Sequence, residues 1–333
     1  MSNETLTQKK TKKGIKTLII IASILLVLIS AVLIYYFGAT HPDFYLVATK
    51  DFQIPGLNTK FVPQGLDYDQ TNEVFLVSGY MSNGETSRIY IVDSSENFKY
   101  FTLKVDGENY LGHAGGIAVS GDYAFVVGDG FLYRFNFKQA LLLENGQSIE
   151  VIDYFETGNG ADFVLTYNNK LIVGEFYLKG KYDTNTEHHI KLSETETNYA
   201  MSYIYTINHS NTCGLQSLEP EAGISMGNKI QGMSFTKDGN IVLSSSYSIP
   251  NSKIYIYENV LNETHFTTTS INGKEIKVYV LSSENLVKTI DSPAMSEELV
   301  LKDNKVYVLF ESNCAKYRLV NRTRLSNVYA LDI

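Results

Sequence analysis

Tryptophan is absent from the 333 residues, and only two cysteines are present. Without tryptophan the chain cannot carry the tryptophan–aspartate dipeptide that marks one class of repeat protein. The sequence also lacks a GxxxxGK[ST] phosphate-binding loop, an HExxH zinc motif and a CxxC pair. These absences exclude assignments that rest on those motifs, so an activity has to be argued from other side chains.

Positively charged side chains are scarce outside the first 16 residues. The chain holds 28 Lys and Arg against 36 Asp and Glu, a formal net charge of −8. Residues 1–16 contain five lysines and one glutamate, a net charge of +4, which leaves −12 for the rest of the chain. Nucleic-acid binding needs clustered basic residues. We therefore expect no nucleic-acid partner and interpret the acidity as favouring solubility, with cation or cationic-partner binding as the alternative.

A long apolar run follows the basic segment. Leu18 to Phe37 contains no charged residue, and a helix of about 20 such residues spans a bilayer core of about 30 Å. Lysines precede the run, which predicts a cytoplasmic N-terminus. We predict a cytoplasmic basic tail at 1–16, a single transmembrane helix at 17–38 and an extracytoplasmic domain at 39–333, anchored in the cell membrane. A cleaved signal peptide is the alternative, but the run is longer than a usual h-region and no A-x-A-like site follows it.

One pattern occurs five times: a small or acidic anchor, a hydrophobic strand, a polar turn and a second hydrophobic strand. The anchors are Gly65, Gly116, Asp162, Gly232 and Glu298, and the copies read PQGLDYDQTNEVFLVSGY, HAGGIAVSGDYAFVVGDG, GADFVLTYNNKLIVGEFY, IQGMSFTKDGNIVLSSSY and SEELVLKDNKVYVLFES. The turns are rich in Asn, Asp and Gly, which is typical of tight hairpins. This recurrence predicts an all-β fold, a five-bladed β-propeller that follows the transmembrane helix.

The remaining strands complete the predicted blades. Third strands are expected at SRIYIVD, FLYRFNF, MSYIYTI, SKIYIYE and SNVYALDI, and outer strands at FKYFTLKV, SIEVIDYF and IKVYVL. Insertions lengthen the third and fourth repeats, so a six-bladed ring is the alternative. The fifth blade lacks an outer strand, and we expect residues 44–52 to supply it and close the ring. Without a low-complexity linker, the ring is predicted to be one domain.

One face of the predicted ring gathers the candidate ligand-binding residues. Propeller topology places the loops that lead into each blade, and the loops after each second strand, on the same face. The first set supplies Gln64, His113, Asp162, Gln231, Glu297 and Glu298, and the second set supplies Tyr80, Glu175, Tyr247 and Glu311. The longest loops open there too. Binding residues concentrate on loops carried by a rigid scaffold, so this face is the predicted site.

Each candidate also has a structural interpretation. Gln64 and Gln231 can satisfy backbone groups of a neighbouring blade, whereas His113 can be an acid, a base or a ligand contact. The carboxylates can hold a central cation such as Ca²⁺ or supply a catalytic pair. Their alternative is a salt bridge to Lys316 or Arg318. No metal-binding set and no cofactor is assigned.

Two further pairs of residues are interpreted as unrelated to the site. Cys213 and Cys314 could form a disulfide outside the cell. The predicted strand order places them on opposite faces, about 17 to 20 Å apart, so two free thiols are expected. His188 and His189 are interpreted as solvated residues of a polar insertion.

The repeats carry a resemblance to known proteins. The segments VPQGLDYD, SGY, HAGGIAVSGDYAFVVG, LSSSY and EELVLKDNKVYVLFES resemble a family of uncharacterised secreted or membrane-anchored bacterial propellers, over most of residues 55–333. More loosely, the chain is similar to NHL and YVTN-type propellers, which are chiefly binding scaffolds, and to arylesterase and lactonase propellers, which hold calcium on the axis. No lactonase motif is matched residue by residue, and Gln64 and Gln231 stand where carboxylates would be wanted.

These observations predict a binding or recognition module at the cell envelope, with a glycan or an envelope protein as its ligand. The alternative is a carboxylate- or metal-dependent hydrolase, glycosidase- or lactonase-like, on the same face. Glu175 and Glu311 would then be acid and base, with His113 as a third candidate. A spacer role is a third hypothesis, which an apolar patch on one face would favour.

Overall fold

The computed structural model describes residues 3–37, 40–262 and 266–333. The chain divides into two compact units, the first ending at His41 and the second running from Pro42 to Ile333. Helix α1 (Asn3–Phe37) belongs to the first unit. Its segment Ile15–Tyr35, with a mean hydropathy of 3.1, is long and apolar enough to cross a membrane. That property is compatible with a membrane anchor or with a signal peptide.

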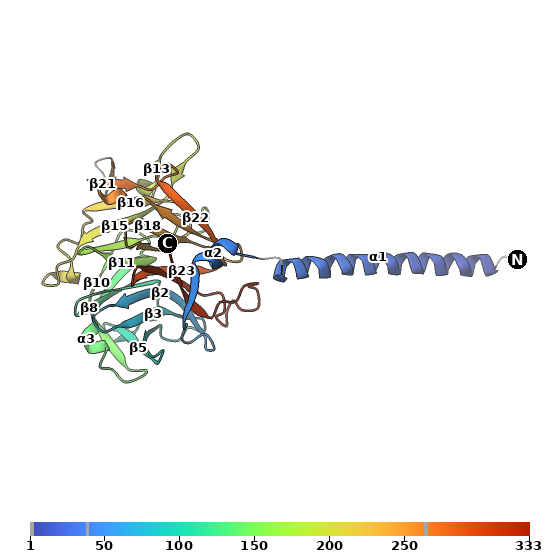
Figure 1. The fold of residues 1–333 in the computed structure, drawn as a ribbon, viewed down its shortest axis with the longest axis horizontal. Helices are drawn as coiled ribbons and strands as arrows, with labels where there is room; N and C mark the ends of the chain where they lie inside the picture. Colours follow the sequence, from blue (N-terminus) through green and yellow to red (C-terminus); the bar gives the residue numbers. More distant parts are fainter. Residues whose placement is uncertain (1–2, 38–39, 263–265) are drawn as a thin grey trace. The chain divides into compact units, whose positions relative to one another are not determined.

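In the described part of the second unit, antiparallel strand pairing defines five four-stranded blades. Figure 1 labels many of their strands. Blade 1 is formed by β2 (Phe61–Asp69), β3 (Val74–Met81), β4 (Arg88–Val92) and β5 (Phe98–Val105). Blade 2 is formed by β7 (Gly116–Ser120), β8 (Tyr123–Gly128), β9 (Phe131–Asn136) and β10 (Ser148–Glu156). Blade 3 is formed by β11 (Phe163–Tyr167), β12 (Lys170–Gly174), β15 (Ala200–Thr206) and β16 (Ala222–Met226).

Blades 4 and 5 follow the same order. Blade 4 is formed by β17 (Ile230–Phe235), β18 (Ile241–Ser245), β19 (Ser252–Tyr257) and β22 (Leu286–Ser292). Blade 5 is formed by β23 (Ser296–Lys302), β24 (Lys305–Phe310), β25 (Asn327–Leu331) and, at its outer edge, β1 (Ala48–Gln53). The first strands contact one another in the cyclic order β2, β7, β11, β17, β23 and β2. The predicted all-β propeller is confirmed.

The hydrophobic core is divided into five layers, each between two neighbouring blades. The layer between blades 5 and 1 contains Phe61, and the layer between blades 1 and 2 contains Phe101. Phe125, Phe163 and Phe310 belong to the next three layers around the ring. All five rings are fully buried, and each contributes about 1.5 to 3 kcal/mol relative to an exposed side chain. Stacking of blade on blade is therefore what stabilises the ring.

The anchor glycines lie where the first strands of neighbouring blades come close together. A Cβ atom on Gly116 would lie 2.6 Å from the backbone nitrogen of Val164 in the next blade. A Cβ atom on Gly232 would lie 2.6 Å from the Cα atom of Glu298, again in the next blade. Such distances leave no room for a side chain. The glycines of the repeat are therefore required by close approach of the inner strands.

The N-terminal strand of the second unit completes the last blade. β1 pairs antiparallel with β25, with Ala48 opposite Leu331. The predicted outer strand is thus present, but it begins later than expected, because residues Pro42–Val47 form the short helix α2. Phe44 of this helix is fully buried and packs edge-on against Phe310. The helix is therefore fixed to blade 5 by aromatic packing.

The assignment of IKVYVL as an outer strand of blade 4 was wrong. This sequence lies in β21 (Lys274–Val280), which pairs parallel with β16 and so extends blade 3, with β20 (Thr267–Ile271) beyond it. The outer strand of blade 4 is β22 instead. β16 offered an unpaired edge, and an edge strand accepts any suitable partner. The insertion in blade 4 therefore adds two strands to its neighbour.

The other connections contain short elements. The insertion of blade 3 carries η1 (Thr186–His188), β13 (Ile190–Lys191) and β14 (Thr197–Asn198). Elsewhere lie β6 (Glu108–Asn109), α3 (Phe137–Ala140), η2 (Thr212–Gly214) and η3 (Val260–Asn262). The side chain of Asn136 caps α3 by accepting a hydrogen bond from Gln139.

Candidate functional site

A cavity of about 600 Å³ lies at the predicted face of the ring. All five blades contribute to its wall, through residues before or near the start of first strands and residues at or after the end of second strands. The lining side chains include Gln64 and Tyr80, His113 and Asp129, Asp162 and Phe176, Lys181 and Tyr182, Gln231 and Tyr247, and Glu311, Lys316 and Tyr317. The set contains both aromatic rings and hydrogen-bonding groups. A polar, aromatic cavity of this size accommodates a small molecule or part of a polymer.

A chain of side chains from blades 1, 2 and 5 forms one wall. Gln64 donates from Nε2 to Glu311 Oε2 at 3.0 Å, and its Oε1 lies 2.5 Å from His113 Nε2. The His113 ring stacks on Tyr80, with 4.7 Å between centroids. Lys316 donates to the Tyr80 hydroxyl at 2.6 Å. Each group is thus oriented by the next, which pre-organises this wall.

Two acidic side chains of the cavity wall, Asp162 and Glu311, have pKa values near neutral pH. Burial raises the pKa of Asp162 to about 7, opposed by a hydrogen bond from the backbone N–H of Phe176 and assisted by the charge of Glu175. Burial also raises the pKa of Glu311 to about 7, opposed by the charge of Lys316 and by hydrogen bonds from Glu297 and Gln64. Both acids are therefore partly protonated near neutral pH.

Glu297 lies beneath Glu311 and is its direct partner. Burial, the charge of Glu311 and the hydrogen bond between the two carboxyl groups raise the pKa of Glu297 well above its usual range. Its Oε1 is buried and has no hydrogen-bond partner among the described residues. Ionisation of both of two adjacent carboxyl groups is unfavourable, because their negative charges repel each other. A proton shared by the pair is therefore favoured on Glu297, whose pKa is raised the more strongly.

Glu298 has a different environment although it follows Glu297 in the chain. It is fully buried. Its Oε2 accepts from the backbone N–H groups of Leu66 and Ile117, at 3.1 and 3.2 Å, and its Oε1 accepts from Val164 at 3.0 Å. These donors belong to the first strands of blades 1, 2 and 3. Glu298 therefore joins four blades at the ring centre and does not line the cavity.

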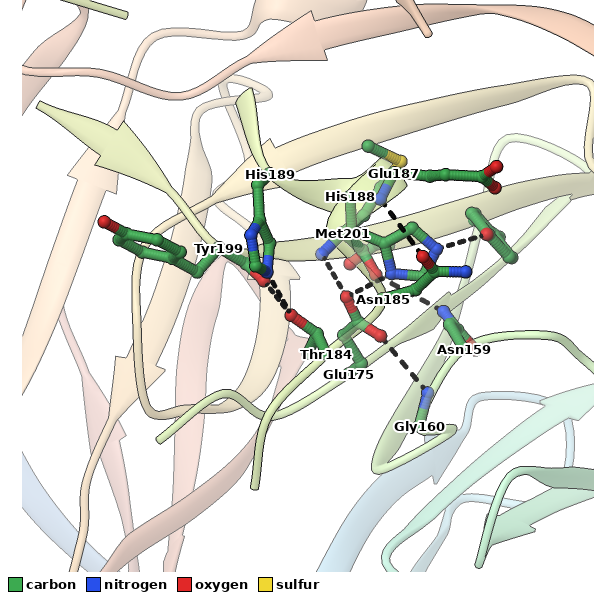
Figure 2. A network of polar contacts seen from close by, with 12 residues as sticks. Asn159, Gly160, Glu175, Thr184, Asn185, Glu187, His188, His189, Tyr199 and Met201 are labelled. Carbon is green, nitrogen blue, oxygen red and sulfur yellow. Dashed lines mark hydrogen bonds and ion pairs between the residues drawn. The ribbon is translucent and has the colours of Figure 1, made fainter. Parts of the chain in front are cut away.

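Glu175 is also buried, and Figure 2 shows its surroundings. It accepts from the backbone N–H of Met201 at 2.9 Å, from Gly160 at 3.3 Å and from His188 Nδ1 at 2.7 Å. His188 Nε2 in turn lies 2.7 Å from the hydroxyl of Tyr203. The interpretation of His188 as a solvated loop residue was therefore wrong. Its partners are Glu175, directly after β12, and Tyr203 of β15, so it fixes the insertion to blade 3.

The opposite wall contains the contacts of blades 3 and 4. Lys181 donates to the Tyr247 hydroxyl at 2.7 Å, and Phe176 lies beside Tyr247, with 6.0 Å between centroids. Gln231 also lines the cavity. Its primary amide offers two donors and one acceptor oxygen, so it can take part in recognition.

The structure brings seven of the ten sequence-predicted residues into the cavity lining. These are Gln64, Tyr80, His113, Asp162, Gln231, Tyr247 and Glu311. Glu175, Glu297 and Glu298 are buried behind or beneath it. The expected salt bridges to Lys316 and Arg318 are absent from the described residues, since Lys316 contacts Tyr80 and Arg318 donates to the Leu57 carbonyl at 2.6 Å. The sequence analysis did not identify Lys181, Tyr182 and Tyr317 as site residues. The feature that could have indicated them is a Lys-Tyr dipeptide that occurs in two of the long loops.

Two other sequence features lie outside the cavity. Cys213 and Cys314 are both free and buried, which confirms the expected thiols. Residues 223–227 read GISMG, a match to the GxSxG pattern of serine hydrolases. In those enzymes the serine occupies a sharp strand-to-helix turn. Here Ser225 is buried within β16, so it cannot act as an exposed nucleophile. Among the described residues no group of three or more His, Cys, Asp or Glu is arranged to hold a metal ion.

Comparisons with known proteins show distant likenesses only. No family model matches the chain, and no curated protein matches it. The PQQ-bound form of aldose sugar dehydrogenase from Streptomyces coelicolor is similar at 10% identity, with a TM-score of 0.46, over 86% of this chain and 96% of that one. Regucalcin, a calcium-binding protein from Agrobacterium tumefaciens, is similar at 9% identity, with a TM-score of 0.43, over 85% and 94%. Likenesses this weak carry no argument about a ligand, and membership of the family suggested by the sequence stays a prediction.

Proposed function

We propose that this protein is a membrane-anchored propeller that binds a carbohydrate in the cavity at its loop-rich face. The observation that carries the proposal is the lining of that cavity. The rings of Tyr80, Phe176, Tyr182, Tyr247 and Tyr317 border it. Flat aromatic faces suit the C–H faces of sugar rings, and tyrosine hydroxyls add polar contacts at the edge.

Hydrogen-bonding groups complete the match to a polyol. Gln231 and the exposed Asp129 lie among the rings, and both accept hydrogen bonds from hydroxyl groups. The partly protonated Asp162 and Glu311 can donate as well as accept. A sugar presents many hydroxyl groups that need both kinds of partner. The mixed donor and acceptor lining therefore favours a glycan over an apolar ligand.

The location proposed for this module is the outer side of the cell membrane. Helix α1 supplies a segment long enough to span a bilayer, and five lysines precede it. The excess of lysine favours a cytoplasmic N-terminus, which would place the propeller outside. Protease treatment of intact cells tests this orientation: the propeller should be digested while a tag on the N-terminus is protected.

A hydrolase is the second candidate, and one observation favours it. Glu311 lies on the cavity wall with its pKa raised to about 7, which suits a general acid or base. However, retaining and inverting glycosidases need two carboxyl groups that both reach the substrate, about 5 to 5.5 Å apart in the first case and about 6.5 to 9.5 Å in the second. Glu297, the neighbour of Glu311, is buried and does not line the cavity. Glu175, the other candidate acid, is buried and fully engaged by backbone donors and His188. Binding is therefore favoured over hydrolysis.

Titration of the full chain in lipid nanodiscs with a panel of oligosaccharides tests the proposal. At least one oligosaccharide should bind, and Tyr247→Ala should weaken that binding about tenfold, since an aromatic contact is worth about 1 kcal/mol beyond its buried area. Tyr154→Ala is the matched control, because Tyr154 is an exposed tyrosine of the outer strand β10. Absence of binding across the panel would refute the proposal, and release of reducing sugar would favour the hydrolase.

A further inference from the structure

Lys316 is held on the cavity wall by two tyrosines. Its ammonium donates to the Tyr80 hydroxyl at 2.6 Å. It also lies 4.9 Å from the ring centroid of Tyr80 and 4.9 Å from that of Tyr317. Cation–π contacts of this kind fix an ammonium in place without removing its charge. Lys316 is nevertheless an exposed side chain, so its remaining N–H donors can reach a ligand.

Lys181 is held in the same way on another part of the wall. It donates to the Tyr247 hydroxyl at 2.7 Å, and its ammonium lies 5.2 Å from the ring centroid of Tyr182 and 5.3 Å from that of Tyr247. The hydrogen bond to Tyr247 and the two ring contacts account for the position of this ammonium. Lys181 too is exposed.

The two clusters have the same construction, although they come from different blades. In each, a Lys-Tyr dipeptide in the long loop after a second strand meets a tyrosine at the end of a second strand in the adjacent blade. Residues 316 and 317 belong to blade 5 and meet Tyr80 of blade 1, whereas residues 181 and 182 belong to blade 3 and meet Tyr247 of blade 4. Two independent loops thus place an ammonium on one cavity.

Neither ammonium is paired with a carboxylate among the described residues, where the ion pairs involve other lysines, arginines and His188. A lysine has three N–H donors, and the tyrosine hydroxyls do not use them all. Tyrosine contacts therefore orient these charges and leave them available.

We propose that the ligand of this cavity is an anionic glycan, whose carboxylate or phosphate groups are contacted by Lys181 and Lys316. The inference rests on the proposed function, because it specifies the class of carbohydrate. Lysine acts as a compact point charge that suits either anion. A cationic ligand is disfavoured, because the two ammonium groups on the cavity wall would repel it.

The floor of the cavity tolerates an anion for a second reason. Its acidic groups are Asp129, Asp162 and Glu311, with the buried Glu297 behind them, and His113 lies beside them; the other titratable side chains of the lining are the two lysines and four tyrosines. The raised pKa values of Asp162 and Glu311, about 7 each, reduce the negative charge that an approaching anion meets near neutral pH. Asp129 is at the exposed rim.

Calorimetric titration of the full chain, in nanodiscs of neutral phosphatidylcholine, tests the inference. The probes are matched oligosaccharides that are neutral, carry a uronic acid or carry a phosphate. One charged probe should bind at least about fivefold more tightly than the neutral one, since a partly exposed ion pair contributes up to about 1 kcal/mol. Lys181→Gln and Lys316→Gln should each weaken binding of the charged probe by about that factor more than they weaken binding of the neutral probe. The charge-matched control is Lys237→Gln, in the exposed hairpin turn after β17.

Four outcomes separate the proposals. Preference for the carboxylate or the phosphate probe, lost in both lysine variants, supports the inference and identifies the anion. Equal affinity for neutral and charged probes overturns the inference and leaves carbohydrate binding standing. Equal weakening of both probes by the lysine variants also overturns it, because the lysines would then only position the tyrosines. Failure of every probe to bind overturns the proposed function together with the inference.

Discussion

Two sets of glutamates at the same end of the ring differ in what hydrogen-bonds them. Glu298 and Glu175 lie in the interior and accept N–H groups of the backbone, from three strands in one case and from Met201 and Gly160 in the other. Glu297 and Glu311 form a pair with each other at the cavity, and Glu311 is also bonded to Gln64.

The difference shows that position decides the role of these acids more than residue type does. Glu297 and Glu298 are adjacent in the sequence and both buried, yet they lie where the register of β23 against β24 shifts, and they meet different surroundings. The interior acids accept hydrogen bonds from backbone N–H groups, so their role is structural. Glu311 lines the cavity with side-chain partners, which makes it available to ligands, and its pairing with the buried Glu297 makes it sensitive to pH.

The largest effect should come from removing an interior acid. Glu298→Ala should lower the free energy of unfolding by about 3 to 5 kcal/mol, because three buried N–H groups lose their acceptor and a cavity is left. Denaturant unfolding followed by circular dichroism measures this, since the chain has no tryptophan. Glu298→Gln keeps an acceptor oxygen and the volume and should cost less. A loss below about 1 kcal/mol for the alanine variant would show that the acid does not join the blades.

Loss of His188 should have a smaller effect on stability. His188→Ala leaves the buried Tyr203 hydroxyl without its partner and takes one of three from Glu175, which should cost about 2 to 3 kcal/mol. The rate of backbone amide hydrogen exchange should rise in the insertion of blade 3 that contains η1. His189→Ala is the control: that ring is half-buried and lies 3.1 Å from the Thr184 hydroxyl, so the change should be about 1 kcal/mol or less.

The cavity acids should make stability depend on pH. Burial raises the pKa of Asp162 from 3.8, and that of Glu311 from 4.5, to about 7. The folded state therefore binds more protons than the unfolded state between about pH 4 and 7, and stability must fall as the pH rises through that window. Thermal unfolding should give a higher midpoint at pH 5 than at pH 8. A midpoint that rises over this range would contradict the raised pKa values.

The smallest effect should come from neutralising a single cavity acid. Glu311→Gln should change the free energy of unfolding at pH 7 by less than about 1 kcal/mol, because an amide can keep the bond to Gln64 and no buried backbone donor is abandoned. The same variant should flatten the decline in stability between pH 5 and 8. Glu187→Gln, at an exposed position of η1, is the control and should leave the decline unchanged.

The sequence alone was sufficient for features that depend on local patterns. Alternating hydrophobic residues around the turn KDNK predict the strand pair β23 and β24. In that turn Asp303 and Asn304 adopt positive φ angles of 49° and 69°. The seven cavity residues followed from the same repeat, because their positions relative to each strand are fixed by the blade topology. Periodicity thus predicted both the scaffold and most of the lining.

Features that depend on distant partners could not be predicted in this way. The strand β21 carries a clear β pattern, but nothing local reveals that it pairs with β16 of the preceding blade. His188 lies in a polar stretch, and its burial depends on Glu175 and Tyr203 in neighbouring strands. Likewise, Lys181 becomes a candidate site residue only through its hydrogen bond to Tyr247 of another blade. Partner choice across the fold is set by packing that a repeat pattern does not encode.

The pairing of β1 with β25 has a consequence for biosynthesis. The two strands lie roughly 280 residues apart, so during translation β1 must wait while the sheets between them are made. Contacts of such long sequence separation form slowly, and an exposed strand edge invites wrong partners in the meantime. The ring should therefore close only after β25 has been synthesised, and the charged residues Lys50 and Asp51 of β1 can keep that nascent edge from aggregating.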